Sequence, residues 1–198
     1  KDEQTLRDSV INLKKKIKED KTIDDLKDEP ELQSSYYHNM YEEEIQFIHE
    51  IQRQQRYSKL LILFVFYEDS LRKISEILEQ KSSQKKEKKS KGVNDLEVYW
   101  NHIVSTPYLD PTVSQESFDY INSQKFIRDK IAHKNGVYAK SEATVGKYEF
   151  VKKKGLSQIE YGNEYKIKID DPVYLTDLTE QIKTNLISII HAVDNALQ

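Results

Sequence analysis

The 198-residue sequence contains no cysteine and only five glycines. Without cysteine, the chain cannot be a disulfide scaffold, bind a metal through thiolates or use a cysteine nucleophile. The glycines do not form GxGxxG, a phosphate-binding P-loop or the GxSxG turn of many hydrolases. The common nucleotide-binding and hydrolase motifs are therefore excluded.

Long apolar runs and an excess of one charge are also missing. The longest apolar run, residues 60–67, is much shorter than the roughly eighteen residues that a membrane-spanning helix needs. Lys and Arg total 31 and Asp and Glu total 34, which gives a formal net charge of -3 and argues against indiscriminate coating of nucleic acid. We therefore expect a cytoplasmic protein with no membrane segment and no cofactor.

Apolar residues at helical spacing predict a bundle of helices. A charged N-terminal arm, residues 1–35, contains one short amphipathic helix around residues 6–17. No proline or glycine occurs in residues 31–78, which predicts one long helix or two helices that meet near Arg53. Further helices are expected over residues 93–104, 114–134 and 175–197.

The apolar pattern changes to strict alternation before the last helix, which predicts a small antiparallel β-meander over about residues 145–170. The Gly162-Asn163 pair is typical of a two-residue hairpin turn. The expected fold is therefore mainly α, with the meander inserted before the final helix of a main domain, residues 36–198. The alternating residues are Tyr148, Phe150, Ile159, Tyr161, Tyr165, Ile167 and Ile169.

Arg128 and His133 are the residues best suited to carry chemistry. Metal-free phosphodiester cleavage needs a group that exchanges a proton near neutral pH and a fixed cation for the charge that develops on phosphorus oxygens. Five residues apart on a helix, the two differ by about 140° around the axis. Asp129 and His133, four apart, do share a face. A site would form with a second helix or a second copy of the chain.

A purely structural role for the same helix end is also open. Lys130, His133 and Lys134 lie in the last helical turn before Asn135-Gly136. Cations there are stabilised by the helix dipole, by about 0.3 to 1 kcal/mol each, without any catalysis. Asn135 and Gly136 are the residues best able to adopt the left-handed conformation that ends a helix.

The string from Arg128 to Gly136, RDKIAHKNG, resembles the R-[ND]-x-I-A-H-x-x-G form of the R-x4-6-H motif in HEPN-superfamily ribonucleases. These are small α-helical proteins common in prokaryotic toxin-antitoxin, CRISPR and anti-phage systems. The tyrosine-rich helix that carries Glu68, the helix that ends at the motif and the last helix resemble the HEPN core. The resemblance implies a HEPN-like helical bundle, with the arm and the meander as additions.

The resemblance also implies an activity. It points to a metal-independent endoribonuclease that cleaves single-stranded RNA for antiviral defence or as a toxin, with the motifs of a homodimer forming one composite site. His133 would act as general base or acid, Arg128 would stabilise the phosphorane, and Asp129 would orient the imidazole or the nucleophile. Products would end in 2',3'-cyclic phosphates. The implied partners are RNA, a second copy and a neutralising antitoxin or defence-system partner.

Other residues around the motif are candidates for RNA binding. Lys125 and Lys134 flank it and, with Asn135, could contact the substrate. Asn135 occupies the place of the tyrosine that is modified in HEPN toxins controlled by a nucleotidyltransferase antitoxin. That mode of control is therefore not expected.

Glu68 is a supporting candidate with two open interpretations. It could hold Arg128 or His133 in place, or it could pair within its own helix with Arg72, four residues later. The sequence does not decide between these.

Two rival functions fit the same residues. One is a catalytically inactive HEPN-like module that binds RNA, a nucleotide or a protein, and the other is a structural helical interaction domain. A zincin-type zinc site is absent, because His49-Glu50 begins like HExxH but Arg53 stands at the second ligand position. A metal nuclease with carboxylates on converging elements stays open at this point.

Overall fold

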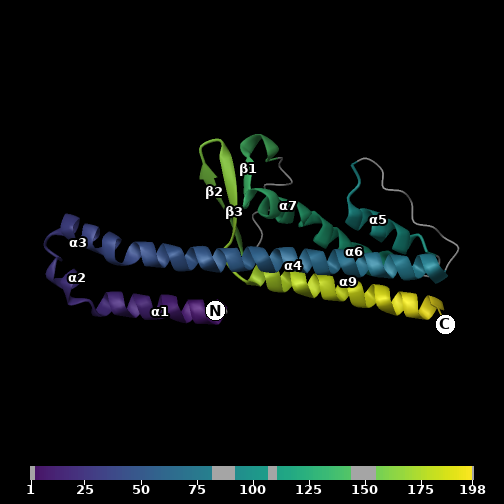
Figure 1. Ribbon diagram of the computed structural model, residues 1–198, viewed down its shortest axis with the longest axis horizontal. Coiled ribbons are helices and arrows are strands. Elements are labelled where there is room, and N and C mark those ends of the chain that lie inside the picture. Colours follow the sequence, from purple (N-terminus) through teal and green to yellow (C-terminus); the bar gives the residue numbers. More distant parts are fainter. Residues whose placement is uncertain (1–2, 82–91, 107–110, 144–154, 198) are drawn as a thin grey trace. The chain divides into compact units, whose positions relative to one another are not determined.

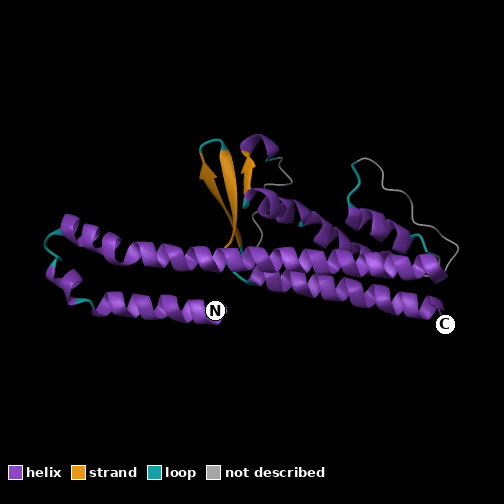
Figure 2. Ribbon diagram, viewed as in Figure 1, coloured by secondary structure: helices purple, strands orange, loops and turns teal. Residues whose placement is uncertain are grey.

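The computed structural model describes residues 3–81, 92–106, 111–143 and 155–197 (Figure 1). The mainly α class is confirmed: most of these residues are helical, and a three-stranded antiparallel sheet precedes the last helix (Figure 2). The chain divides into two compact units, Lys1–Tyr57 and Ser58–Gln198. The boundary lies inside a long helix, whereas the sequence pattern places the end of the N-terminal arm at residue 35.

The first unit has its own apolar core. Leu6 and Leu13 of the first helix are buried in one cluster with Tyr41 and Ile48, so the stretch after residue 35 packs with the arm. The amphipathic helix predicted around residues 6–17 is confirmed. The unit's elements are α1 (Glu3–Glu19), α2 (Lys21–Asp25), α3 (Pro30–Tyr37), a π-helical turn (His38–Glu42) and the start of α4 (Glu43–Lys81).

Helix α4 is continuous over 39 residues and has no break at Arg53, so the one-helix alternative is correct for this stretch. A π-helical turn separates α4 from α3. Among the described residues, no helix is both long enough and apolar enough to cross a membrane. In the second unit the buried face of α4 follows heptad spacing and consists of Leu60, Phe64, Tyr67, Leu71 and Leu78.

Helix α9 (Val173–Leu197) confirms the predicted final helix and packs along α6 (Pro111–Ser123). It also contacts α4 through a buried polar pair, in which the Tyr67 hydroxyl donates to Asn185 Oδ1 at 2.7 Å. Both residues are fully buried. Because a buried polar group must find a partner, this hydrogen bond fixes the register of α4 against α9.

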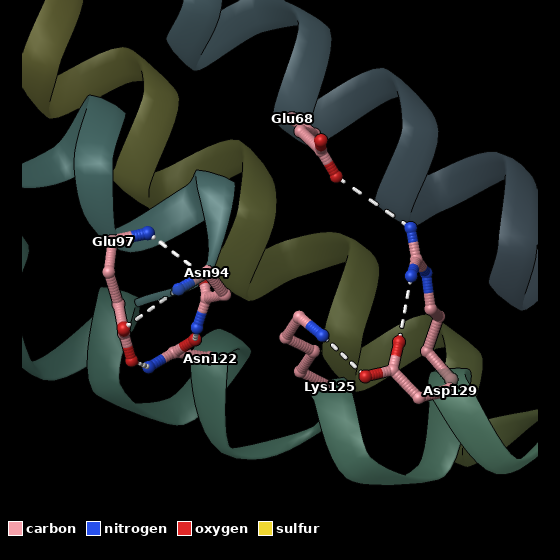
Figure 3. Close-up of polar contacts among 7 residues, drawn as sticks. Glu68, Asn94, Glu97, Asn122, Lys125 and Asp129 are labelled. Carbon is pink, nitrogen blue, oxygen red and sulfur yellow. Dashed lines mark hydrogen bonds and ion pairs between the residues drawn. The ribbon is translucent and has the colours of Figure 1, made fainter. Parts of the chain in front are cut away.

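Helix α5 (Asp95–Val104) begins with a capping box between Asn94 and Glu97. Asn122 of α6 joins this network: its amide donates to Glu97 Oε1 at 3.1 Å and accepts from Asn94 Nδ2 at 3.3 Å (Figure 3). The Asn-x-x-Glu spacing is a sequence signature of a helix start that our sequence reading missed. The network ties the first turn of α5 to α6.

The single helix predicted over residues 114–134 is wrong: the structure has two helices, α6 and α7 (Lys125–Lys134). They are separated at Gln124, whose side chain is fully buried. Its Nε2 donates to the Tyr120 carbonyl at 3.2 Å, and its Oε1 accepts from the Tyr174 hydroxyl at 3.1 Å. A side chain that bonds into the backbone ladder interrupts a helix. The apolar spacing continues through this break, so periodicity alone did not reveal it.

The sheet has the strand order β1-β3-β2 and is antiparallel throughout. Its strands are β1 (Val137–Ala139), β2 (Leu156–Tyr161) and β3 (Glu164–Ile169). The predicted Gly162-Asn163 hairpin is confirmed, and Gly162 has the positive φ of 52° that such a turn favours.

The strand β1 was not predicted, because three residues are too few to show an alternating period. It follows α7 directly, and Ile167 N of β3 donates to the Gly136 carbonyl at 2.9 Å. The sheet therefore anchors the end of the motif helix. The strand predicted at Tyr148 and Phe150 lies outside the described residues.

Candidate functional site

The motif lies on α7 and on the turn that ends it. Asn135 adopts the left-handed conformation at φ 49° and ψ 39°, and Gly136 follows with φ 82°. Gly136 N donates to the Lys130 carbonyl at 2.9 Å, which closes the last turn. The helix end predicted at Asn135-Gly136 is therefore confirmed.

Arg128 is half-buried and is held from several sides. Its Nη1 donates to Asp129 Oδ1 at 2.7 Å, and its Nη2 lies 3.7 Å from Glu68 Oε2 on α4. The two carboxylates thus engage different nitrogen atoms of the guanidinium. The ring of Phe64 lies beneath it, with 5.9 Å between the guanidinium carbon and the ring centroid. These contacts restrict the orientation of a side chain that is otherwise flexible.

Glu68 pairs with Arg128 and not with Arg72, which decides between the two interpretations that the sequence left open. Arg72 instead donates to Asp69 at 2.5 Å and to Glu76 at 2.7 Å along its own helix. The Glu68 contact is an ion pair beyond hydrogen-bond distance. Within the described part of the chain, the Glu68 carboxylate accepts no hydrogen bond.

Asp129 is bound by the cations on its own helix. Its carboxylate accepts from Lys125 Nζ and from Arg128. Burial acts to raise the pKa of Asp129, but the hydrogen bonds from Lys125 and Arg128 outweigh it and hold the pKa below the ordinary value of 3.8. Asp129 is therefore an anion at neutral pH, and the structure directs it to Arg128 and not to His133.

His133, Lys134 and Asn135 are exposed at the end of α7. The His133 imidazole makes no hydrogen bond or ion pair with any described residue. Lys134 lies 3.9 Å from Glu142, and Asn135 is also exposed. The structure thus brings Lys125, Arg128 and Asp129 together with Glu68. His133 lies one turn beyond Asp129 and contacts none of these four residues through a hydrogen bond or ion pair.

A pocket opens beside Arg128, between α4, α5 and α7. Its volume is about 260 Å³, somewhat below the roughly 300 to 1,000 Å³ of pockets that hold drug-sized ligands. Of the residues that the structure describes, two guanidinium groups and two carboxylates line it, with one phenol and one aliphatic side chain. The lining residues are Val65, Glu68, Asp69, Arg72, Tyr99 and Arg128.

Among the described lining residues, Tyr99 is the one that α5 contributes. Burial is the main cause that raises its pKa, and the carboxylates of Asp95 and Glu68 raise it further. Tyr99 therefore presents a neutral phenol at physiological pH. The sequence reading missed both Tyr99 and the pocket role of Arg72, because nothing in their spacing relates α5 to α4.

No three His, Asp or Glu side chains lie close enough to hold a metal ion in the parts of the chain that the structure describes. Comparison with known proteins finds no family model, no curated protein and no solved structure that matches this chain. Its own residues and their geometry are therefore the basis for assigning a function.

Proposed function

We propose that the protein is a metal-independent endoribonuclease of HEPN type, whose active site is completed when two copies of the chain meet. The observation that supports this most is the placement of the two motif side chains. Arg128 is oriented by carboxylates at the rim of a pocket, while His133 is exposed and has no partner among the described residues. His133 is exposed, and 22% of the Arg128 side-chain surface remains accessible.

A single chain cannot bring both groups to one phosphate. Arg128 and His133 lie about 140° apart around α7, so they face different directions. A two-fold axis near the end of α7 would place the His133 of one copy across from the Arg128 of the other. The homodimer is therefore part of the proposed mechanism.

An exposed apolar stripe on α4 supports this second copy. Ile62, Val65 and Phe66 are 67%, 62% and 57% exposed, although side chains of this size are usually buried. Val65 also lines the pocket beside Arg128. A copy of the chain that covers the stripe would therefore lie next to the candidate site.

The proposed chemistry uses only side chains. His133 accepts the proton of a ribose 2'-hydroxyl, the 2'-oxygen attacks phosphorus, and the bond to the 5'-oxygen breaks. The leaving oxygen takes a proton from the second imidazole or from water. Arg128 stabilises the charge on the phosphorane, and Asp129 orients Arg128. The products are a 2',3'-cyclic phosphate and a 5'-hydroxyl.

Residues at the exposed end of α7 would contact the RNA backbone. Lys134 and Asn135 are both exposed. Lys125 is bound to Asp129, so it would act on a phosphate only after leaving that carboxylate. Defence or growth arrest, with an antitoxin or another defence-system partner, is the setting that we propose for this activity.

A catalytically inactive HEPN-like binding module is the second candidate. The specific observation in its favour is that Arg128 is already held by two carboxylates and is separated from His133. Such a module would bind RNA, a nucleotide or a protein partner through the same surface.

The test is incubation of labelled single-stranded RNA with the protein in EDTA. We expect cleavage with cyclic-phosphate ends, and we expect Arg128→Ala and His133→Ala to lose it while keeping the wild-type circular dichroism spectrum. His191→Ala is the matched control, because His191 is an exposed histidine on α9. Intact RNA at high protein concentration, or an equal loss in the His191 variant, would refute the assignment.

A further inference from the structure

The pocket beside Arg128 contains an acceptor and a donor that are not paired with each other. Glu68 and Arg72 are four residues apart on α4, and at this spacing opposite charges usually meet. Here Arg72 is engaged by Asp69 and Glu76, and Glu68 accepts no hydrogen bond from any described residue. Both side chains nevertheless line the same pocket. Their hydrogen-bonding capacity is therefore available to a ligand.

Arg72 keeps donors for such a ligand. A guanidinium carries five N–H donors, and the described residues take up two of those of Arg72. Asp69 and Glu76 hold the guanidinium in place but do not use all of its N–H donors. Glu68 similarly offers two carboxylate oxygens, since its contact with Arg128 is 3.7 Å long.

The charge of the lining argues against a phosphate inside the pocket. Glu68 and Asp69 would repel an anion, and together they balance the two guanidinium groups. A neutral, planar ligand with donors on one edge and acceptors on the next fits better. Tyr99 adds an aromatic surface and Val65 an apolar one, which suit the faces of a nucleobase.

We propose that this pocket is a guanine-binding subsite. Guanine carries two adjacent donors, N1–H and the N2 amino group, which match the two oxygens of Glu68. Its O6 and N7 acceptors are the usual partners of an arginine fork, here Arg72. Adenine, cytosine and uracil lack the pair of adjacent donors. The base stacks on Tyr99.

This subsite adds a base preference to the proposed ribonuclease. It rests on the proposed function, because it takes RNA as the source of the guanine. With the base bound by Glu68 and Arg72, the attached phosphate lies outside the pocket on the side of Arg128. Arg128 then remains free for the phosphorane. Cleavage is therefore expected beside guanosines.

The experiment is calorimetric titration of the full chain with GMP, IMP, AMP, CMP and UMP. These share a ribose phosphate, so differences report on the base. We expect GMP to bind about tenfold more tightly than AMP, CMP or UMP. IMP lacks only the N2 amino group and should fall between GMP and AMP. Equal affinity for all five, or no binding at millimolar concentration, would overturn the subsite.

Two variants assign the roles of the lining residues. Glu68→Gln, with a single amide oxygen, should remove the preference for GMP over AMP, whereas Glu79→Gln, an exposed carboxylate on the same helix, should keep it. Tyr99→Ala should weaken the binding of all five nucleotides to the same degree, because it removes the stacking surface. Tyr99→Phe keeps the ring and should leave their affinities unchanged. An unchanged GMP preference in Glu68→Gln would contradict the proposal. The comparison of IMP with GMP tests the contact to the N2 amino group in the wild-type protein, so it does not depend on whether a variant folds.

Failure of the subsite and failure of the ribonuclease are distinguishable. Selective GMP binding by a protein that leaves RNA intact would support the subsite, with a free nucleotide as its ligand, and contradict the ribonuclease assignment. Cleavage of RNA without preference for guanosine would support the ribonuclease assignment and contradict the guanine-binding subsite. Cleavage mapped beside guanosines supports both.

Discussion

The Glu68 carboxylate on α4 lies 3.7 Å from the Arg128 guanidinium on α7. Both side chains are mostly shielded from solvent, with 33% and 22% of their surfaces exposed. This contact joins α4 to the helix that carries the motif. It gives the arginine a fixed direction before any substrate arrives, which is the kind of preorganisation that electrostatic catalysis requires.

A mixture of two inactive variants should recover activity. In a composite site, a dimer of Arg128→Ala with His133→Ala still holds one guanidinium and one imidazole. Random mixing produces such heterodimers as about half of all dimers. We expect measurable RNA cleavage from the refolded mixture and none from either variant alone. If the mixture is as inactive as its components, each chain uses its own arginine and histidine.

The apolar stripe on α4 should control association. Val65→Asp and Phe66→Asp place a charge on an exposed apolar surface, so they should abolish a dimer formed there without unfolding the chain. Sedimentation velocity measures the change. Ile190→Asp, at an isoleucine of α9 that is 47% exposed, is the control. A wild-type monomer under conditions of active cleavage would contradict the shared site.

Acid should selectively remove the contribution of Asp129 to stability. The pKa of Asp129 in the folded protein is lowered, so its stabilisation is complete above the unfolded value of about 3.9 and is lost as the pH falls through the folded pKa. Asp129→Asn should therefore lower Tm at pH 7, and the difference from wild type should shrink below about pH 4. Thermal unfolding across pH measures this, with exposed Asp194→Asn as control. A constant difference would mean that Asp129 is not paired in the folded state.

Tyr67→Phe should destabilise the second unit. The substitution removes the donor that Asn185 Oδ1 accepts at 2.7 Å in a fully buried environment. Loss of such a buried hydrogen bond costs about 1 to 3 kcal/mol. Urea unfolding measures the change, and Tyr161→Phe, at a position 61% exposed, should cost almost nothing. Equal stability of the two variants would show that the buried contact is dispensable.

The helices were predictable because their apolar faces repeat with the helical period. Leu60, Phe64 and Tyr67 show the pattern that buries α4, and Asn135-Gly136 gives the chemistry of a helix end. The break at Gln124 was not predictable in the same way. Glutamine is a good helix former, and only the distant Tyr174 and the burial of the amide turn it into an interruption.

The candidate site was predictable only in part. The motif string identified Arg128, Asp129 and His133, but the partner of Glu68 depends on how α4 and α7 pack. A carboxylate with one arginine four residues away and another on a different helix has two plausible partners, and local spacing favours the wrong one. The sequence could not identify Tyr99 as a site residue either, because its position beside α4 depends on how α5 packs in the folded chain.

The buried amide of Gln124 also determines how mutation can reach Arg128. Helix α7 begins directly after this residue, and the Gln124 carbonyl accepts from Arg128 N at 3.2 Å in its first turn. A substitution that removes the Gln124 amide or the Tyr174 hydroxyl would therefore affect Arg128 through the first turn of α7. An insertion or deletion of one residue between Gln124 and Arg128 would turn the arginine by about 100° around α7 and away from Glu68.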